Sequence, residues 1–177
     1  MNDDPRHPIG PFEAPAGPLS EARRSALIAE VKAAPAALRA AFSGLTPQRL
    51  ATAYRPGGWT LRQVAHHVPD SHLNAYVRFR LALTEDKPTI KPYAEDRWAE
   101  LPEAKTAPVE LSLDLLEALH RRFVLLLLNM SAAEWSRQLT HPDHGLVGLE
   151  WLLAMYAWHG RHHTGHVTSL RRRQGWA

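Results

Sequence analysis

The sequence predicts an all-α protein built as a four-helix bundle. Apolar residues recur at helical spacing in four long segments, and capping residues or proline-rich breaks separate these segments. We find no convincing alternation of the kind that marks a strand and no internal repeat. Four long helices joined by irregular segments are typical of a bundle. The length of 177 residues suits a single domain over 1–177.

The first part of the chain is predicted to be an arm followed by a helix. Residues 1–18 hold five prolines and are expected to be extended. Ser20 is expected to cap a helix that runs to about Phe42, and Pro35 should kink or divide it. A short helical piece is expected at 45–53.

The second long helix is expected after the glycine-rich turn at 54–58. Thr60 can cap it, and it should run to about Leu83. Residues 84–108 hold four prolines and form a long connection. Long ordered loops are often lids or binding loops. Tyr93 and Trp98 are therefore expected to line the substrate side of a lid, or else to pack within a surface loop.

The remaining helices follow from similar signals. A third long helix fits Leu111 to Asn129, and Ser131 begins a capping-box pattern for a short helix. A turn is expected at 141–145. The last helix is expected from about Leu149 to Arg173, ended by Gly175.

Composition excludes several classes of protein. The chain has no cysteine, which excludes disulfides, thiolate zinc sites and a cysteine nucleophile and fits a cytoplasmic protein. Residues 1–18 lack the apolar core of a signal peptide, and the longest apolar run, 123–128, is too short to span a membrane. The net charge is only +3, and the basic run 171–173 suits a helix end. We therefore expect neither a membrane nor a nucleic acid as partner.

Histidine is the unusual residue. There are eleven, and four of them continue the apolar stripe of the last helix at positions i, i+3, i+4 and i+7. Two histidines four residues apart on a helix can share one metal ion. His159 with His163 and His162 with His166 both satisfy that spacing, and helical phase alone leaves the two pairs open.

A stable metal site needs a further ligand from another segment. The second helix offers three histidines, and only His67 lies within its apolar face. His66 points roughly opposite and His72 lies at the edge of that face. A surface or hydrogen-bonding role is expected for the other histidines: His66, His72, His120, His141 and His144.

Two long motifs resemble a known family. Residues 59–72 and 156–166 are similar to the signature of the YfiT group within the DinB superfamily. The resemblance extends from Pro8 to Trp176 through shorter matches at 8–10, 54–59, 78–85, 91–93, 141–143 and 173–176.

The resemblance implies a four-helix bundle with a three-histidine site that keeps open positions for water. Carried over by motif, the ligands are His67, His159 and His163. One divalent ion per subunit is implied, of the zinc or nickel type, in a homodimer. The sequence departs from the family pattern at Pro69 and at Gly160-Arg161. His162 and His166 are left with supporting roles.

The expected function is that of an enzyme acting on a small-molecule substrate. The first hypothesis is a metal-dependent hydrolase that activates water. The alternative is a metal-dependent transferase that adds a low-molecular-weight thiol, such as bacillithiol, to an electrophile. A third class is a stress or binding protein without turnover. Asp70 and His166 are the candidates for a catalytic base or for supporting the ligands.

Overall fold

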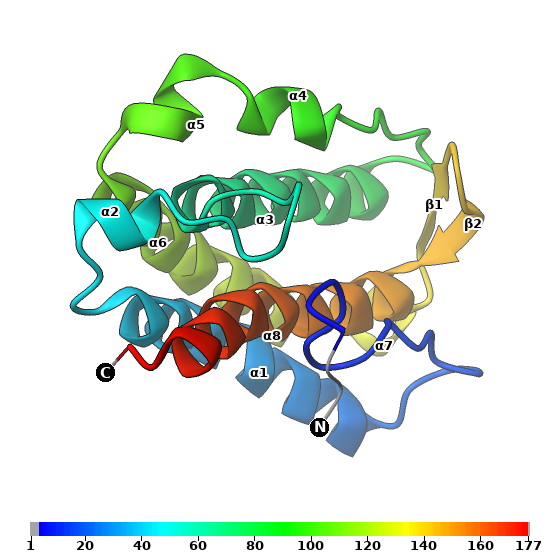
Figure 1. Cartoon of the computed structure of the whole chain (residues 1–177). Coiled ribbons are helices and arrows are strands. Elements are labelled where there is room, and N and C mark those ends of the chain that lie inside the picture. Colours follow the sequence, from blue (N-terminus) through cyan, green and yellow to red (C-terminus); the bar gives the residue numbers. More distant parts are fainter. Residues whose placement is uncertain (1–3, 177) are drawn as a thin grey trace.

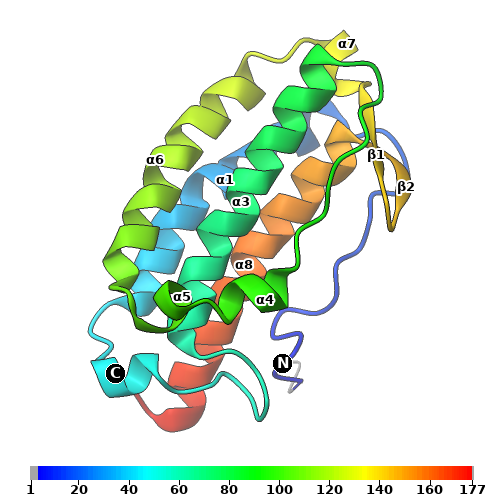
Figure 2. The ribbon, with the colours of Figure 1, turned by 90° about the horizontal axis from the view of Figure 1, so that it is seen from above.

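Four long helices form the bundle, as predicted. The computed structural model describes residues 4–176, and Figures 1 and 2 show the long helices side by side. Helix α1 packs on α6 and α8, and α3 packs on the same two helices. The long helices are α1 (Glu21–Phe42), α3 (Leu61–Thr84), α6 (Val109–Leu128) and α8 (Leu149–Gln174). The short ones are α2 (Pro47–Leu50), α4 (Glu95–Ala99), α5 (Pro102–Thr106) and α7 (Ala132–Trp135).

Capping side chains set the helix boundaries. The Ser20 hydroxyl accepts from the Arg23 N–H at the start of α1. Thr60 and Gln63 form a capping box that begins α3, and Ser131 begins α7 in the same way. Gly175 ends α8 with a φ of 62°, a conformation that glycine adopts without strain.

Two prolines lie inside long helices. Pro35 in α1 and Pro69 in α3 are buried, and both helices continue past them. Pro35 was expected to kink or divide its helix, and it does not divide it. A proline removes one intrahelical hydrogen bond. In a long amphipathic helix, tertiary packing provides most of the stability, so it can offset that loss.

The turn expected at 141–145 is present, but it joins two short strands that were not expected. Strands β1 (Gln138–His141) and β2 (Gly145–Gly148) pair antiparallel, with Leu139 opposite Val147. Each strand has four residues, too few to show a clear alternation. The hairpin also holds the connection 84–108, because Ile90 N–H donates to the Thr140 carbonyl at 3.0 Å. That connection is not a plain loop, since it contains α4 and α5.

The core consists of two apolar clusters separated by histidines. On α6, Leu116 belongs to one cluster and Phe123 to the other, and His120 lies between them. On α8, the histidines lie between Ala157 and Val167 in the same way. We call these buried or half-buried imidazoles the histidine layer: His67, His72, His120, His159, His163 and His166. It crosses the middle of the bundle.

The apolar run of α6 divides between core and solvent. Phe123 is fully buried, whereas Leu125 is 62% exposed. Within residues 4–176, no helix combines the length and the hydropathy that a membrane span requires.

Replacing Phe123 with alanine should test the packing of this core. Removal of a fully buried phenylalanine leaves a cavity, so Phe123→Ala should lower the free energy of unfolding by about 3–5 kcal/mol. Urea denaturation measures this change. Leu125→Ala on the same helix is the matched control and should alter stability by less than about 0.5 kcal/mol. Equal effects of the two changes would contradict the packing described here.

Candidate metal centre

Three histidines from two helices converge in the histidine layer. His67 comes from α3, and His159 and His163 come from successive turns of α8. One ring nitrogen from each lies within 4.8 Å of the other two. The Nε2 atoms of His67 and His159 are 3.3 Å apart. The structure thus brings together the three residues that the resemblance assigned as ligands.

The spacing of these nitrogens fits a divalent ion. Nitrogens that bind zinc tetrahedrally at about 2.0–2.1 Å lie about 3.3–3.4 Å from one another. The His67 and His159 Nε2 atoms already have this separation. Among the described residues, this is the group of histidine and carboxylate side chains placed to hold a metal. The donor set therefore fits a zinc-type ion.

Burial keeps these imidazoles neutral and therefore able to bind a metal. Burial, together with the repulsion that a protonated His166 would exert, lowers the pKa of His67 to about 4. Burial and the neighbouring imidazoles hold the pKa values of His159 and His163 well below the ordinary value. Each ring therefore keeps one free nitrogen lone pair at neutral pH.

The second pair on α8 lies beside the first. His166 Nδ1 is 3.3 Å from His163 Nδ1, and the His166 ring stacks on Tyr54 at 4.0 Å. His162 stacks on Trp158 at 4.3 Å. His166, expected to be a base or a supporting residue, thus touches a candidate ligand.

Two further histidines of the layer were not predicted to belong to the site. His72 Nε2 lies 3.2 Å from His159 Nδ1, and His120 Nε2 lies 2.8 Å from His72 Nδ1. His120 also reaches the Val31 carbonyl oxygen at 2.7 Å. A surface or hydrogen-bonding role was expected for both, and the structure shows the hydrogen bonds in the core and not at the surface. A signal for His120 was available, because it occupies an apolar-stripe position of α6 between Leu116 and Phe123.

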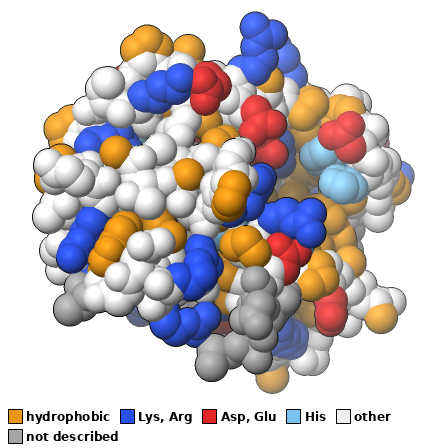
Figure 3. All heavy atoms as spheres, viewed as in Figure 1, with side chains coloured by type: hydrophobic (Ala, Val, Ile, Leu, Met, Phe, Trp, Pro, Cys, Tyr) orange, Lys and Arg blue, Asp and Glu red, His pale blue; other side chains and the backbone are white. Residues whose placement is uncertain are grey.

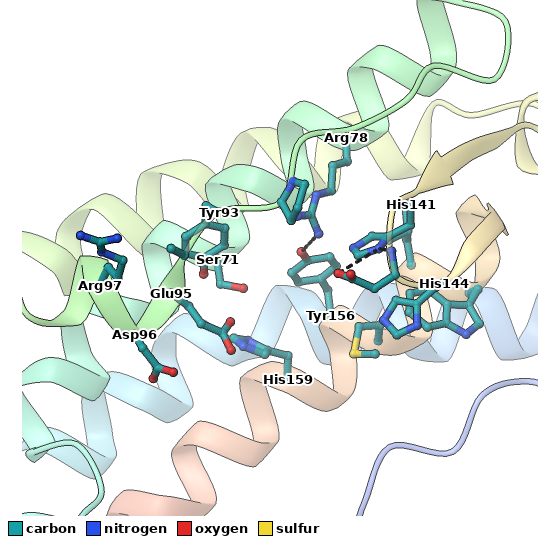
Figure 4. A pocket seen from close by; sticks show the side chains of 16 residues that line it. Ser71, Arg78, Tyr93, Glu95, Asp96, Arg97, His141, His144, Tyr156 and His159 are labelled. Carbon is teal, nitrogen blue, oxygen red and sulfur yellow. Dashed lines mark hydrogen bonds and ion pairs between the residues drawn. The ribbon is translucent and has the colours of Figure 1, made fainter.

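A cavity of about 650 Å³ opens beside the candidate ligands. Its wall includes His159 itself, Tyr93 from the 84–108 connection and His141 from the hairpin. Figure 4 shows Glu95 pointing toward His159, and Arg78 donating to the Tyr156 hydroxyl at 3.1 Å. Figure 3 shows this face hollowed, with charged side chains around the opening.

A smaller cavity of about 320 Å³ lies over the ligands. All three candidate ligands line it, together with His162 and His166. His159, Glu95 and Asp96 line both cavities. The two spaces therefore meet at one edge of the site.

The carboxylates that line the cavities are not Asp70, the one proposed from the sequence. Asp70 follows His67 by one turn, and burial and Glu103 raise its pKa to about 6. It is not among the residues that line the two cavities, and its catalytic role stays a prediction. Glu95 and Asp96 of α4 line both. They were missed because no helix was expected within 84–108.

Of the two aromatic residues singled out in the 84–108 connection, only Tyr93 lines one of the two cavities. Tyr93 lines the larger cavity. Trp98 packs on Tyr93 with ring centres 4.6 Å apart, but it is 40% exposed and is absent from the wall of either cavity.

The N-terminal arm packs against α8 near Gly165 and His166. Figure 1 shows the arm lying against this helix. Gly165 permits a close approach, since a Cβ there would meet Pro8 at 3.0 Å and Ile9 at 3.2 Å. The Arg6 carbonyl lies 3.3 Å from His166 Nε2. The arm therefore contacts the histidine layer directly.

Known proteins resemble this chain in sequence. The sequence pattern of the DinB superfamily matches residues 30–167. A protein of Bacillus cereus, strain AH820, is 49% identical over 98% of this chain and 99% of its own length, and another from Bacillus anthracis shows the same identity and coverage. Both are named "putative metal-dependent hydrolase".

Two solved structures share the fold. YfiT from Bacillus subtilis superposes with a TM-score of 0.96 at 42% identity, over 98% of this chain and 99% of its own. It was described as "a probable metal-dependent hydrolase with an unusual four-helix bundle topology". The four-helix bundle protein TT2238 matches 84% of this chain and 98% of its own with a TM-score of 0.52 at 24% identity, a likeness of fold alone.

The metal-free protein should lose stability in mild acid. Unfolded histidines bind protons below a pKa of about 6.5, whereas folded His67 resists protonation down to about 4. The unfolded state binds more protons in that window, so the free energy of unfolding should fall as pH drops from about 6.5 to about 4. His67 alone accounts for roughly 3 kcal/mol. Urea midpoints measured with a chelator at several pH values test this, and a flat profile would contradict it.

Proposed function

Because the chain belongs to the DinB superfamily, we propose that it is a metal-dependent hydrolase with a divalent ion on His67, His159 and His163. We choose zinc because three histidines hold it in known catalytic sites, and nickel is the alternative because imidazole ligands bind it as well. The proposal is supported by the names of relatives that align along nearly the whole chain.

One observation carries the proposal. Two Nε2 atoms, of His67 and His159, face each other at 3.3 Å in a buried layer. Two lone pairs this close repel each other unless a proton or a cation lies between them. The third imidazole nitrogen, from His163, completes one face of a coordination shell and leaves the cavity side for water and substrate. When bound, the ion lowers the pKa of a water ligand toward neutrality.

The residues around the ion have separate tasks. Burial raises the pKa of the Glu95 carboxyl, which points toward His159 and is placed to accept a proton from attacking water. Arg78 and Tyr156 form a polar wall in the larger cavity, where they can orient an oxygen-rich substrate. The volume of about 650 Å³ suits a small molecule.

A thiol S-transferase is the second candidate. Two cavities meet at His159, and the smaller one contains the ligands. This arrangement gives separate space to a low-molecular-weight thiol and to an electrophile. The chain has no cysteine of its own, so the thiol must come from a cosubstrate.

The metal content can be measured directly. Protein purified without chelator and loaded with Zn²⁺ should contain about one ion per chain by elemental analysis. His163→Ala removes one of the three ligands and should weaken binding at least about 100-fold. His66→Leu is the matched control, because His66 is a buried neighbour that bonds Ser112 and Ala107 instead. A wild-type chain that stays metal-free on titration with Zn²⁺ would refute the proposal.

Two chromogenic substrates can distinguish hydrolysis from thiol transfer. Zinc-loaded protein should hydrolyse an activated ester such as p-nitrophenyl acetate without any thiol. The His163→Ala rate should fall at least about 100-fold, whereas the His66→Leu rate should be unchanged. Conjugation of 1-chloro-2,4-dinitrobenzene that requires an added thiol, without ester hydrolysis, would favour the transferase instead.

A further inference from the structure

A chain of imidazoles runs across the whole bundle from the candidate ligand His159. Its Nδ1 lies 3.2 Å from His72 Nε2, and His72 Nδ1 lies 2.8 Å from His120 Nε2. His120 Nδ1 ends the chain at 2.7 Å from the Val31 carbonyl oxygen. The three imidazoles come from α8, α3 and α6, and the carbonyl that ends the chain comes from α1.

The carbonyl at the end fixes the direction of every hydrogen bond. A carbonyl oxygen only accepts, so His120 Nδ1 must carry the proton, and its Nε2 must accept. His72 then donates from Nδ1 and accepts at Nε2. His159 therefore donates from Nδ1, and its own Nε2 is left with a lone pair.

A shorter chain fixes His163 by the same reasoning. His166 Nε2 lies 3.3 Å from the Arg6 carbonyl oxygen and must donate to it. His166 Nδ1 then accepts from His163 Nδ1, which is also 3.3 Å away. The lone pair of His163 is thereby placed on Nε2, the same atom as in His159.

This reasoning requires neutral rings, and the surroundings keep them neutral. His72, His120 and His166 are at most 3% exposed. Burial is the main cause that lowers the pKa of each of them. The hydrogen-bond partners described for these rings are imidazoles and backbone carbonyls, without a carboxylate to stabilise a charged ring.

We propose that the Val31 and Arg6 carbonyls, acting through His120 and His72 and through His166, hold His159 and His163 with the proton on Nδ1. Both ligands then present Nε2 to the ion before it arrives. His72, His120 and His166 are positioning residues that act through the ligands. The inference rests on the proposed metal site.

The proton positions can be observed in the wild-type protein. Long-range ¹H–¹⁵N spectra of zinc-loaded protein distinguish a protonated ring nitrogen from a free one. Nδ1–H is expected on His72, His120, His159 and His163, whereas His166 should carry its proton on Nε2. A proton on Nε2 of His72 or His120, or on Nδ1 of His166, would overturn the proposal.

Substitutions test the effect on metal affinity. His72→Leu and His120→Leu should each weaken Zn²⁺ binding about 10- to 100-fold in competition with a chromophoric chelator. His66→Leu removes a buried histidine of α3 that does not belong to the row of imidazoles, and it should leave the affinity unchanged. His72→Gln should recover much of the loss, because its amide oxygen can accept from His159 Nδ1 and its amide N–H can donate to His120.

The outcomes separate this inference from the proposed function. A wild-type chain that binds no Zn²⁺ would refute both. Zn²⁺ binding that is equally tight in the wild type, His72→Leu and His120→Leu would refute only the positioning chain. Urea unfolding with chelator shows whether each variant folds. If a variant does not fold, the proton positions in the wild-type protein are the test of the positioning chain.

Discussion

The histidine layer is the constraint on which the rest of the structure depends. A buried imidazole is costly unless its nitrogens find partners, and here six such rings lie between two apolar clusters. Hydrogen bonds among the rings and to two backbone carbonyls meet this need for His72, His120 and His166. Helices α3, α6 and α8 supply the imidazoles of the layer, and α1 supplies the Val31 carbonyl that bonds to His120. The site therefore keeps its geometry only if all four helices keep their relative positions.

The site divides into a fixed part and a surrounding wall. The candidate ligands stand on α3 and α8, which pack against each other and against the rest of the bundle. Part of the wall, such as Arg78 and Tyr156, stands on these helices as well. The rest comes from the segments between the long helices: the turn at Tyr54, α4 at Glu95 and the hairpin at His141. Ligands on long packed helices keep a precise geometry, whereas segments of this kind can differ between related proteins and so set the choice of substrate.

Helical phase predicted most of the fold and part of the site. It found the four long helices, selected His67 over His66 and identified one imidazole face on α8, while the choice of His159 with His163 needed the family motif. The hairpin was missed because four-residue strands carry little pattern. His72 and Glu95 were not assigned to the site for another reason. Their roles depend on contacts between elements distant in sequence, such as that of His72 with His120, which periodicity within one helix does not reveal.

The neutrality of the three candidate ligands has a consequence for the charge of the whole site. Imidazole ligands add no negative charge, so a divalent ion held by His67, His159 and His163 keeps its full double positive charge. Glu95 and Asp96, which line both cavities, can offset part of this charge. A substrate that carries its own negative group would complete that balance, and a cationic one would meet repulsion. The ion would thus act as a filter on the charge of incoming molecules before any bond is broken.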